Sequence, residues 1–419
     1  MQSTFAWLDH SEEQRRRMME VVGLFREKGT LDELGIGSVR DALSELLFPG
    51  TSTLHTRARY LLFLPWIFLG IEHDCVSSRA AAERVKRDEI RLIYALDQGE
   101  AGDGIIGVEA RERLSQFPSM MYWTALGRYG IRRLPATRSQ YLRSLDSYYL
   151  RLRHVRSNDD GERIDGVPRH WHAGLPPAPK GLFDKTSFAL SVSEADYLTE
   201  RVVDRCPGTY LAHLVRQSDN MVNADAPWTH PAAKTAPAQV AEHLQHARAF
   251  SDVMHGALLL YGLILAELVR ERRTAGADVA VDADTFEDYG DRLDKWRTSI
   301  ATRHDDLEQW DRQRFWQLVT DANPRIPRLT VLFVRQWIEI VLSRAGDVAG
   351  DATARQLVAA RERQVKRSLA RVANARALER WSGRSGTAAL RFRWLQVQQV
   401  TSDIVAGRKA PERIADART

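Results

Sequence analysis

Apolar side chains recur three and four positions apart along most of the chain, which is the spacing of one face of an α-helix. Stretches that alternate with a period of two are few, so we expect a mainly α, multi-helical fold with few or no strands. The pattern predicts helices over 11–29, 38–48, 79–98, 137–156, 191–203, 208–217, 239–273, 284–301, 304–320, 328–344, 352–381 and 387–406.

Two stretches rich in Gly, Pro and Asp interrupt this pattern, at 157–181 and 223–238. A chain of 419 residues is long enough for two or three packed helical domains. We therefore expect an N-terminal helical domain over 1–156 and an irregular connection with short helices over 157–237. A C-terminal helical domain follows over 238–419.

The composition, 44% hydrophobic and 27% charged, is that of a globular protein. Only Cys75 and Cys206 are present, which excludes a disulfide framework and a cysteine zinc site and suits a reducing compartment. The amino-terminal stretch lacks the basic and apolar regions of a signal peptide. The longest solid apolar run, Tyr60–Leu69, is near half of a bilayer span. We expect a soluble, cytoplasmic protein that does not bind a membrane.

Positive charge is concentrated near the carboxyl end, where residues 351–393 hold eleven basic and three acidic side chains. In a helix over 352–374, one stripe is apolar and the opposite face is basic. A face of this kind can follow a phosphate backbone, although it also suits an acidic protein or simple solvation. The stripe consists of Val358, Val365, Leu369 and Val372, and the candidate nucleic-acid-binding residues are Arg363, Lys366, Arg367, Arg371, Arg391 and Arg393.

The stretch "FPGTSTLHTRARYLLFLPW", residues 48–66, predicts a turn at Pro49–Gly50 and then a helix apolar on all sides, which indicates burial. Pro65 is expected to kink or end this helix. Arg57 and Arg59 lie at the N-terminal end of this helix, where each charge needs a partner. We expect that partner to be internal, such as Glu45 or Asp41 of the preceding helix, and the alternative is an external anion.

The catalytic motifs are incomplete. "GDGIIG" at 102–107 matches a dinucleotide-binding fingerprint, but the segment before it is helical and charged, so we interpret it as a loop. No Gly-Lys-Ser/Thr occurs, which argues against a P-loop nucleotide site. Two histidine pairs, His170 with His172 and His243 with His246, could share a metal only if they converge or gain a third ligand. We therefore assign no catalytic residue, cofactor or metal.

Three blocks of the sequence resemble a bacterial family of unknown function whose members have about this length. They are "FAWLDHSEEQRRRM" (5–18), "GIGSVRDALSELLFPGTSTLHTRARYLLFLPWIF" (35–68) and "GIIGVEARERLSQFPSMMYWTALGRYGIRR" (104–133). The resemblance implies an accessory protein encoded in phage-defence or DNA-modification islands, beside helicases and nucleases. It implies no activity and no site residue.

Three functional hypotheses follow. The first is a non-enzymatic defence component that binds nucleic acid or docks onto a helicase or nuclease. The second is a metal-dependent hydrolase or nuclease that uses the histidine pairs. The third is a protein scaffold whose basic face meets an acidic partner.

Overall fold

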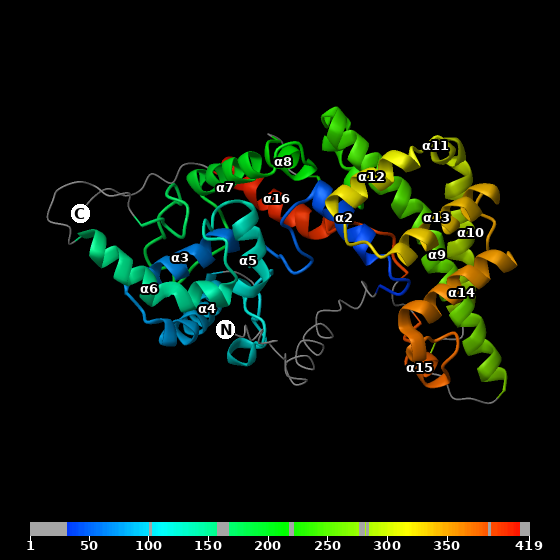
Figure 1. Ribbon diagram of the computed structural model, residues 1–419, viewed down its shortest axis with the longest axis horizontal. Helices are drawn as coiled ribbons and strands as arrows, with labels where there is room; N and C mark the ends of the chain where they lie inside the picture. The colour runs from blue at the N-terminus through cyan, green and yellow to red at the C-terminus, as the bar shows by residue number, and fades with distance from the viewer. Residues whose placement is uncertain are drawn as a thin grey trace, which may run out of the picture. The chain divides into compact units, whose positions relative to one another are not determined.

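The computed structural model describes residues 32–99, 103–156, 167–217, 222–275, 281, 285–383 and 387–410. The mainly α-helical fold predicted from the sequence is confirmed (Figure 1). Within these ranges there is no β-strand, and the backbone of Arg132 and Trp171 forms an isolated antiparallel bridge. The predicted helix over 11–29 lies outside the described residues. The α-helices are α2 (Gly37–Leu47), α3 (Tyr60–His73), α4 (Ser78–Gly99), α5 (Pro118–Arg128), α6 (Arg138–Arg156), α7 (Val192–Arg205), α8 (Tyr210–Val215), α9 (Ala238–Thr274), α10 (Thr285–Thr302), α11 (His304–Glu308), α12 (Arg312–Ala322), α13 (Arg328–Ser343), α14 (Ala352–Lys366), α15 (Ala375–Glu379) and α16 (Trp394–Arg408).

Short 3₁₀ turns connect some of these helices: η1 (Arg111–Arg113), η2 (Pro227–Thr229), η3 (Pro231–Thr235) and η4 (Arg367–Leu369). The predicted helix over 304–320 is two helices, because the Asp311 side chain accepts a hydrogen bond from the Arg314 N–H and starts α12 anew. The predicted helix over 352–381 is also wrong in extent, since α14 ends at Lys366. The apolar spacing reveals neither of these two breaks.

The chain forms two compact units, each built from segments that are distant in the sequence. Unit 1 comprises residues 1–42 and 246–390, and unit 2 comprises residues 43–245 and 391–419. Helices α2 and α9 therefore have residues in both units. The three-part division expected from the sequence follows the order of the chain and differs from this arrangement.

Unit 2 is organised around α3, which packs against α4 and α5, while α4 also packs against α6 (Figure 1). Ten of its fourteen residues are buried, as the all-round apolar pattern predicts. The helix does not end at Pro65 but continues to His73. A second contact within the unit joins α7 to α16, where the small residue Gly407 lies against Leu190 and Ala195.

Unit 1 contains most of α9, which is the longest helix described. Two indole N–H groups donate to its backbone carbonyl oxygens: Trp296 to Asp252 at 2.7 Å and Trp337 to Val253 at 2.8 Å. By length and composition alone α9 could cross a membrane, and 78% of its most apolar window is buried inside the protein. The apolar residues of α9 do not form one solid run, so the longest solid run noted in the sequence, Tyr60–Leu69, does not include this helix.

Candidate functional site

The basic segment of unit 1 begins in α14. The residue before this helix, Asp351, caps it, since its carboxylate accepts a hydrogen bond from the Ala354 N–H at 2.8 Å. Val358 is fully buried, as predicted for the apolar stripe. The stripe does not continue, because the helix ends at Lys366 and Leu369 is then 68% exposed. The single amphipathic helix predicted over 352–374 is therefore wrong.

Two of the predicted nucleic-acid-binding residues, Lys366 and Arg371, form a buried charge cluster and do not lie on a free solvent face. The Lys366 ammonium group contacts Glu33 and lies 3.1 Å from Glu362 Oε1. Arg371 Nη1 donates to Glu33 Oε2 at 2.8 Å. Because both carboxylates are almost fully buried, they require these cations as partners. Lys366 and Arg371 thus neutralise internal acids.

Tyr261 of α9 completes this cluster, since its hydroxyl group donates to Glu362 Oε1 at 2.6 Å. The same carboxylate accepts the backbone N–H groups of Arg371 at 2.9 Å and Val372 at 3.0 Å. Burial disfavours ionisation of Glu362, yet these hydrogen bonds and Lys366 hold its pKa below its usual value. We call Glu33, Tyr261, Glu362, Lys366 and Arg371 the charge cluster.

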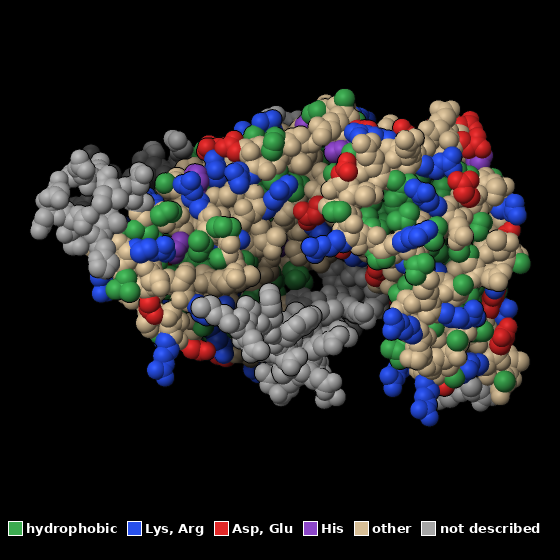
Figure 2. Space-filling view, viewed as in Figure 1, with side chains coloured by type: hydrophobic (Ala, Val, Ile, Leu, Met, Phe, Trp, Pro, Cys, Tyr) green, Lys and Arg blue, Asp and Glu red, His purple; other side chains and the backbone are tan. Residues whose placement is uncertain are grey.

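The arginine side chains of the same segment that remain exposed form the candidate site. Arg363 and Arg367 are exposed, and so are two arginines that the sequence analysis did not single out, Arg376 and Arg380. Among the described residues, none of the four has an acidic partner. Glu379, the one acid within 363–380, pairs with Arg272 at 3.9 Å. Figure 2 shows Lys and Arg side chains gathered over α14 and α15.

We call Arg363, Arg367, Arg376 and Arg380 the basic strip. Arg376 and Arg380 were included in the local charge count over 351–393, which was the signal that could have identified them. These two arginines could not be placed on the exposed surface without knowing that α14 ends at Lys366. A helix continuing past that residue would place other residues on the basic face. Arg391 is exposed but belongs to unit 2. Arg393, also in unit 2, pairs with Glu45 at 2.6 Å and donates to the Thr51 carbonyl oxygen.

Arg57 and Arg59, the candidate anion site, are both engaged in ion pairs within unit 2. Arg57 Nε lies 3.0 Å from Asp403 Oδ2, and Arg59 Nη2 lies 2.8 Å from Glu194 Oε1. The partners are internal, as expected, but they are not the examples suggested by the sequence, Asp41 and Glu45. Those two acids pair with Arg40 and Arg393, because folding brings α7 and α16 to the start of α3.

The histidine pairs have structural partners. His246 Nδ1 accepts the Trp310 indole N–H at 2.8 Å, and His170 Nδ1 lies 2.9 Å from Glu72 Oε1. His255, farther along α9, hydrogen-bonds the Thr387 carbonyl oxygen, and burial lowers its pKa to about 4. Over the described ranges, no group of three or more His, Cys, Asp or Glu side chains is arranged to hold a metal ion. Within those ranges the geometry therefore gives the metal-hydrolase hypothesis no ligand set.

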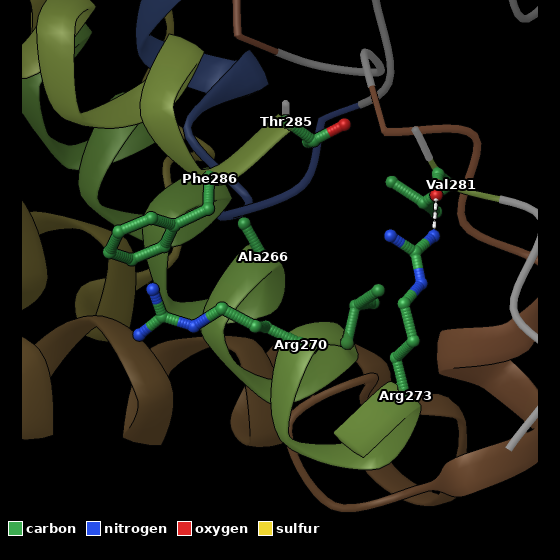
Figure 3. A pocket seen from close by; sticks show the side chains of 7 residues that line it. Ala266, Arg270, Arg273, Val281, Thr285 and Phe286 are labelled. Atoms are coloured by element: carbon green, nitrogen blue, oxygen red, sulfur yellow. Dashed lines mark hydrogen bonds between the residues drawn. The ribbon is translucent and has the colours of Figure 1, made fainter. Parts of the chain in front are cut away.

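One small pocket opens beside the end of α9 in unit 1 (Figure 3). Arg270 stacks over the Phe286 ring at 3.7 Å from its centroid, and Arg273 donates to the Val281 carbonyl oxygen. Both arginines are therefore occupied by the protein. The pocket has a volume of about 20 Å³, which is room for a water molecule and not for an organic ligand.

The described part of the "GDGIIG" segment, residues 103–107, is a loop, as interpreted from the sequence. The preceding element is the helix α4, described to Gly99, whereas a dinucleotide fingerprint needs a strand before it. Gly104 has a φ of +83°, and a Cβ added at this position would lie 2.7 Å from Cγ of Arg57. The glycine therefore serves close packing against Arg57.

The fold and the site together define an all-α protein of two compact units with an exposed basic strip. The chain belongs to the family of unknown function DUF6361, whose family model matches residues 2–406. No curated protein and no solved structure matches the chain.

Proposed function

We propose that this protein is a non-enzymatic component that binds nucleic acid through the basic strip of unit 1. The observation that supports the proposal is the exposure of four arginines within eighteen residues, with no acidic partner for them among the described residues. The two other cations of that segment, Lys366 and Arg371, already neutralise buried carboxylates. The strip therefore retains its positive charge for a partner.

Nucleic acid fits this strip because each guanidinium group is planar, permanently charged and able to donate two hydrogen bonds to one phosphate. Phosphate contacts supply most of the affinity of sequence-independent binding and make it depend on salt. Four such contacts give weak to moderate affinity, which is appropriate for an accessory protein that acts beside another nucleic-acid enzyme.

The resemblance found in the sequence supplies the biological setting of the proposal. In that setting the protein is an accessory component of a bacterial phage-defence or DNA-modification system, located in the cytoplasm, and its protein partner is a helicase or nuclease. Neither a cofactor nor a catalytic residue is part of the proposal. The scaffold hypothesis, in which the strip meets an acidic protein, becomes an outcome of the test.

The test is a fluorescence titration of labelled DNA, duplex and single-stranded, with the full chain at low and moderate salt. The strip variant carries Arg363→Glu, Arg367→Glu, Arg376→Glu and Arg380→Glu. The matched control reverses four exposed cations on α4 and α6 of unit 2: Arg79, Lys86, Arg143 and Arg151. Both variants change the net charge equally, so the comparison separates a local interface from overall attraction.

We expect the wild type and the control to bind at low salt. We expect the strip variant to lose at least about tenfold in affinity, because all four proposed phosphate contacts are replaced by negative charges. Absence of binding by the folded wild type would contradict the proposal. Equal losses in the two variants would also contradict it. Capture of an acidic partner protein that survives nuclease treatment, without DNA binding, would favour the scaffold hypothesis instead.

A further inference from the structure

The turn that follows α14 has an unusual backbone. Arg367 adopts φ +52° and ψ −121°, a left-handed conformation that glycine adopts readily and that a side chain with a Cβ disfavours. The next residues form the 3₁₀ turn η4, and Ala370 at its end is buried. A strained residue persists only where the surrounding structure holds it in place.

The charge cluster holds both ends of this turn. Before the turn, the Lys366 ammonium group is fixed by Glu33, by Glu362 and by the Tyr261 hydroxyl oxygen at 2.9 Å. After the turn, the carboxylate of Glu362 accepts two backbone N–H groups and Glu33 binds the Arg371 side chain. The four residues between Lys366 and Arg371 are therefore fixed at both ends.

The turn presents two side chains to solvent. Arg367 is exposed and makes no ion pair with the described residues. Leu369 is 68% exposed, the highest value among the large apolar side chains that the structure describes as exposed. Since neither side chain packs into the protein, folding alone does not explain an arginine where glycine would fit without strain. An outlier of this kind points to function.

We propose that the Arg367–Leu369 turn contacts a nucleotide with an exposed base, so that the preferred ligand is single-stranded or gapped nucleic acid and not an intact duplex. This inference rests on the proposed function. Arg367 binds the phosphate, and Leu369 contacts the face of the adjacent base. In an intact duplex the base faces are stacked, and an apolar side chain reaches them only at the cost of unstacking. A turn that is already rigid loses little entropy on binding.

The experiment compares three labelled DNA probes of equal length at one salt concentration: an intact duplex, the same duplex with a short gap, and a single strand. We expect the wild type to bind the gapped and single-stranded probes about three- to tenfold more tightly than the duplex, a difference that corresponds to one apolar contact. Leu369→Ser is expected to abolish this preference while keeping the salt dependence. The control is Leu150→Ser, which changes a 54% exposed leucine beside Arg151 on α6.

A second variant separates presentation of the side chain from a role in folding. Arg367→Gly relieves the left-handed strain, so we expect a higher melting temperature together with weaker binding of the gapped probe. Arg367→Lys keeps the positive charge and the strain, and we expect it to retain more affinity than Arg367→Gly at unchanged stability. A merely structural arginine would show binding and stability that change in the same direction.

The outcomes distinguish this inference from the proposed function. If no probe binds with salt dependence, both fail. If all three probes bind with salt dependence but equally well, or if Leu369→Ser keeps the wild-type preference, the inference alone is wrong. Binding to anionic phospholipid vesicles that requires Leu369, with no preference among the DNA probes, would overturn it in favour of a membrane surface.

Discussion

Glu89 of α4 is a fully buried carboxyl group at the start of α5, where it accepts hydrogen bonds from the Ser119 N–H at 2.7 Å and the Ser119 hydroxyl group at 2.9 Å. Burial raises its pKa to about 7, although Ser119 and the charge of Arg138 oppose the shift. Between its ordinary pKa of 4.5 and about 7, the folded state binds more protons than the unfolded state. This group therefore makes the free energy of unfolding fall as the pH rises through that range.

Glu89→Gln removes the titrating group and keeps an acceptor for the Ser119 N–H. We expect the stability of the variant relative to the wild type to increase from pH 5 to pH 8, by on the order of 1–3 kcal/mol. Chemical denaturation at the two pH values measures the difference, with Glu83→Gln on the exposed face of α4 as control. A relative stability that does not change with pH would show that Glu89 is not responsible.

Gly262 of α9 permits the close approach of α10. A Cβ at this position would lie 2.2 Å from the ring atom Cε1 of Tyr289, whose hydroxyl group donates to the Gly383 carbonyl oxygen. We expect Gly262→Ala to lower the free energy of unfolding by roughly 1–3 kcal/mol, because the ring must move. Gly290→Ala is the control, since no atom lies within 4 Å of its Cβ and alanine favours a helix by about 1 kcal/mol. Thermal unfolding is expected to shift in opposite directions in the two variants.

At the scale of elements, the start of α3 is fixed by α16. The carboxylate of Asp403 accepts the Ala58 N–H at 2.8 Å and binds the Arg57 guanidinium group through both oxygens. We expect Asp403→Ala to destabilise the protein by about 2–4 kcal/mol, because it leaves a partly buried arginine without its partner. Asp196→Ala breaks an exposed pair with Arg408 and is expected to cost at most about 1 kcal/mol. Equal effects in a denaturant titration would contradict this role of Asp403.

Most helices can be predicted from the sequence, because the apolar spacing of a helix is formed by residues that lie close together in the chain. The burial of α3 follows from its own apolar run, and the mainly α fold follows from the same spacing along the chain. The partner of Arg57 could not be predicted, because Asp403 lies 346 residues away in the sequence. The end of α14 at Lys366 was missed for the same reason, since the acid that holds the following turn, Glu33, is more than 300 residues away.

The candidate site could likewise be predicted only in part from the sequence. Local charge density identified the region, and Arg363 and Arg367 are exposed there. Which cations are free was not predictable, because it depends on where the buried acids Glu33 and Glu362 lie after folding. A linear pattern counts charges, whereas the three-dimensional structure shows which of them are already neutralised.

At the scale of the whole molecule, each compact unit combines chain segments from both ends of the sequence. Contacts between segments so distant in the sequence must close long loops, which slows folding. We propose that nucleic acid binds to unit 1, which contains the basic strip and the charge cluster. In this proposal the strip is a phosphate-binding surface.

The most direct test is the slope of the logarithm of DNA affinity against the logarithm of salt concentration, for the wild type and for a variant in which the four strip arginines are replaced by glutamine. Four phosphate contacts predict that wild-type affinity falls on the order of 50- to 150-fold between about 50 and 200 mM salt. In the variant we expect most of that dependence to disappear, with the fold unchanged by circular dichroism. Equal slopes in the two proteins would contradict the claim.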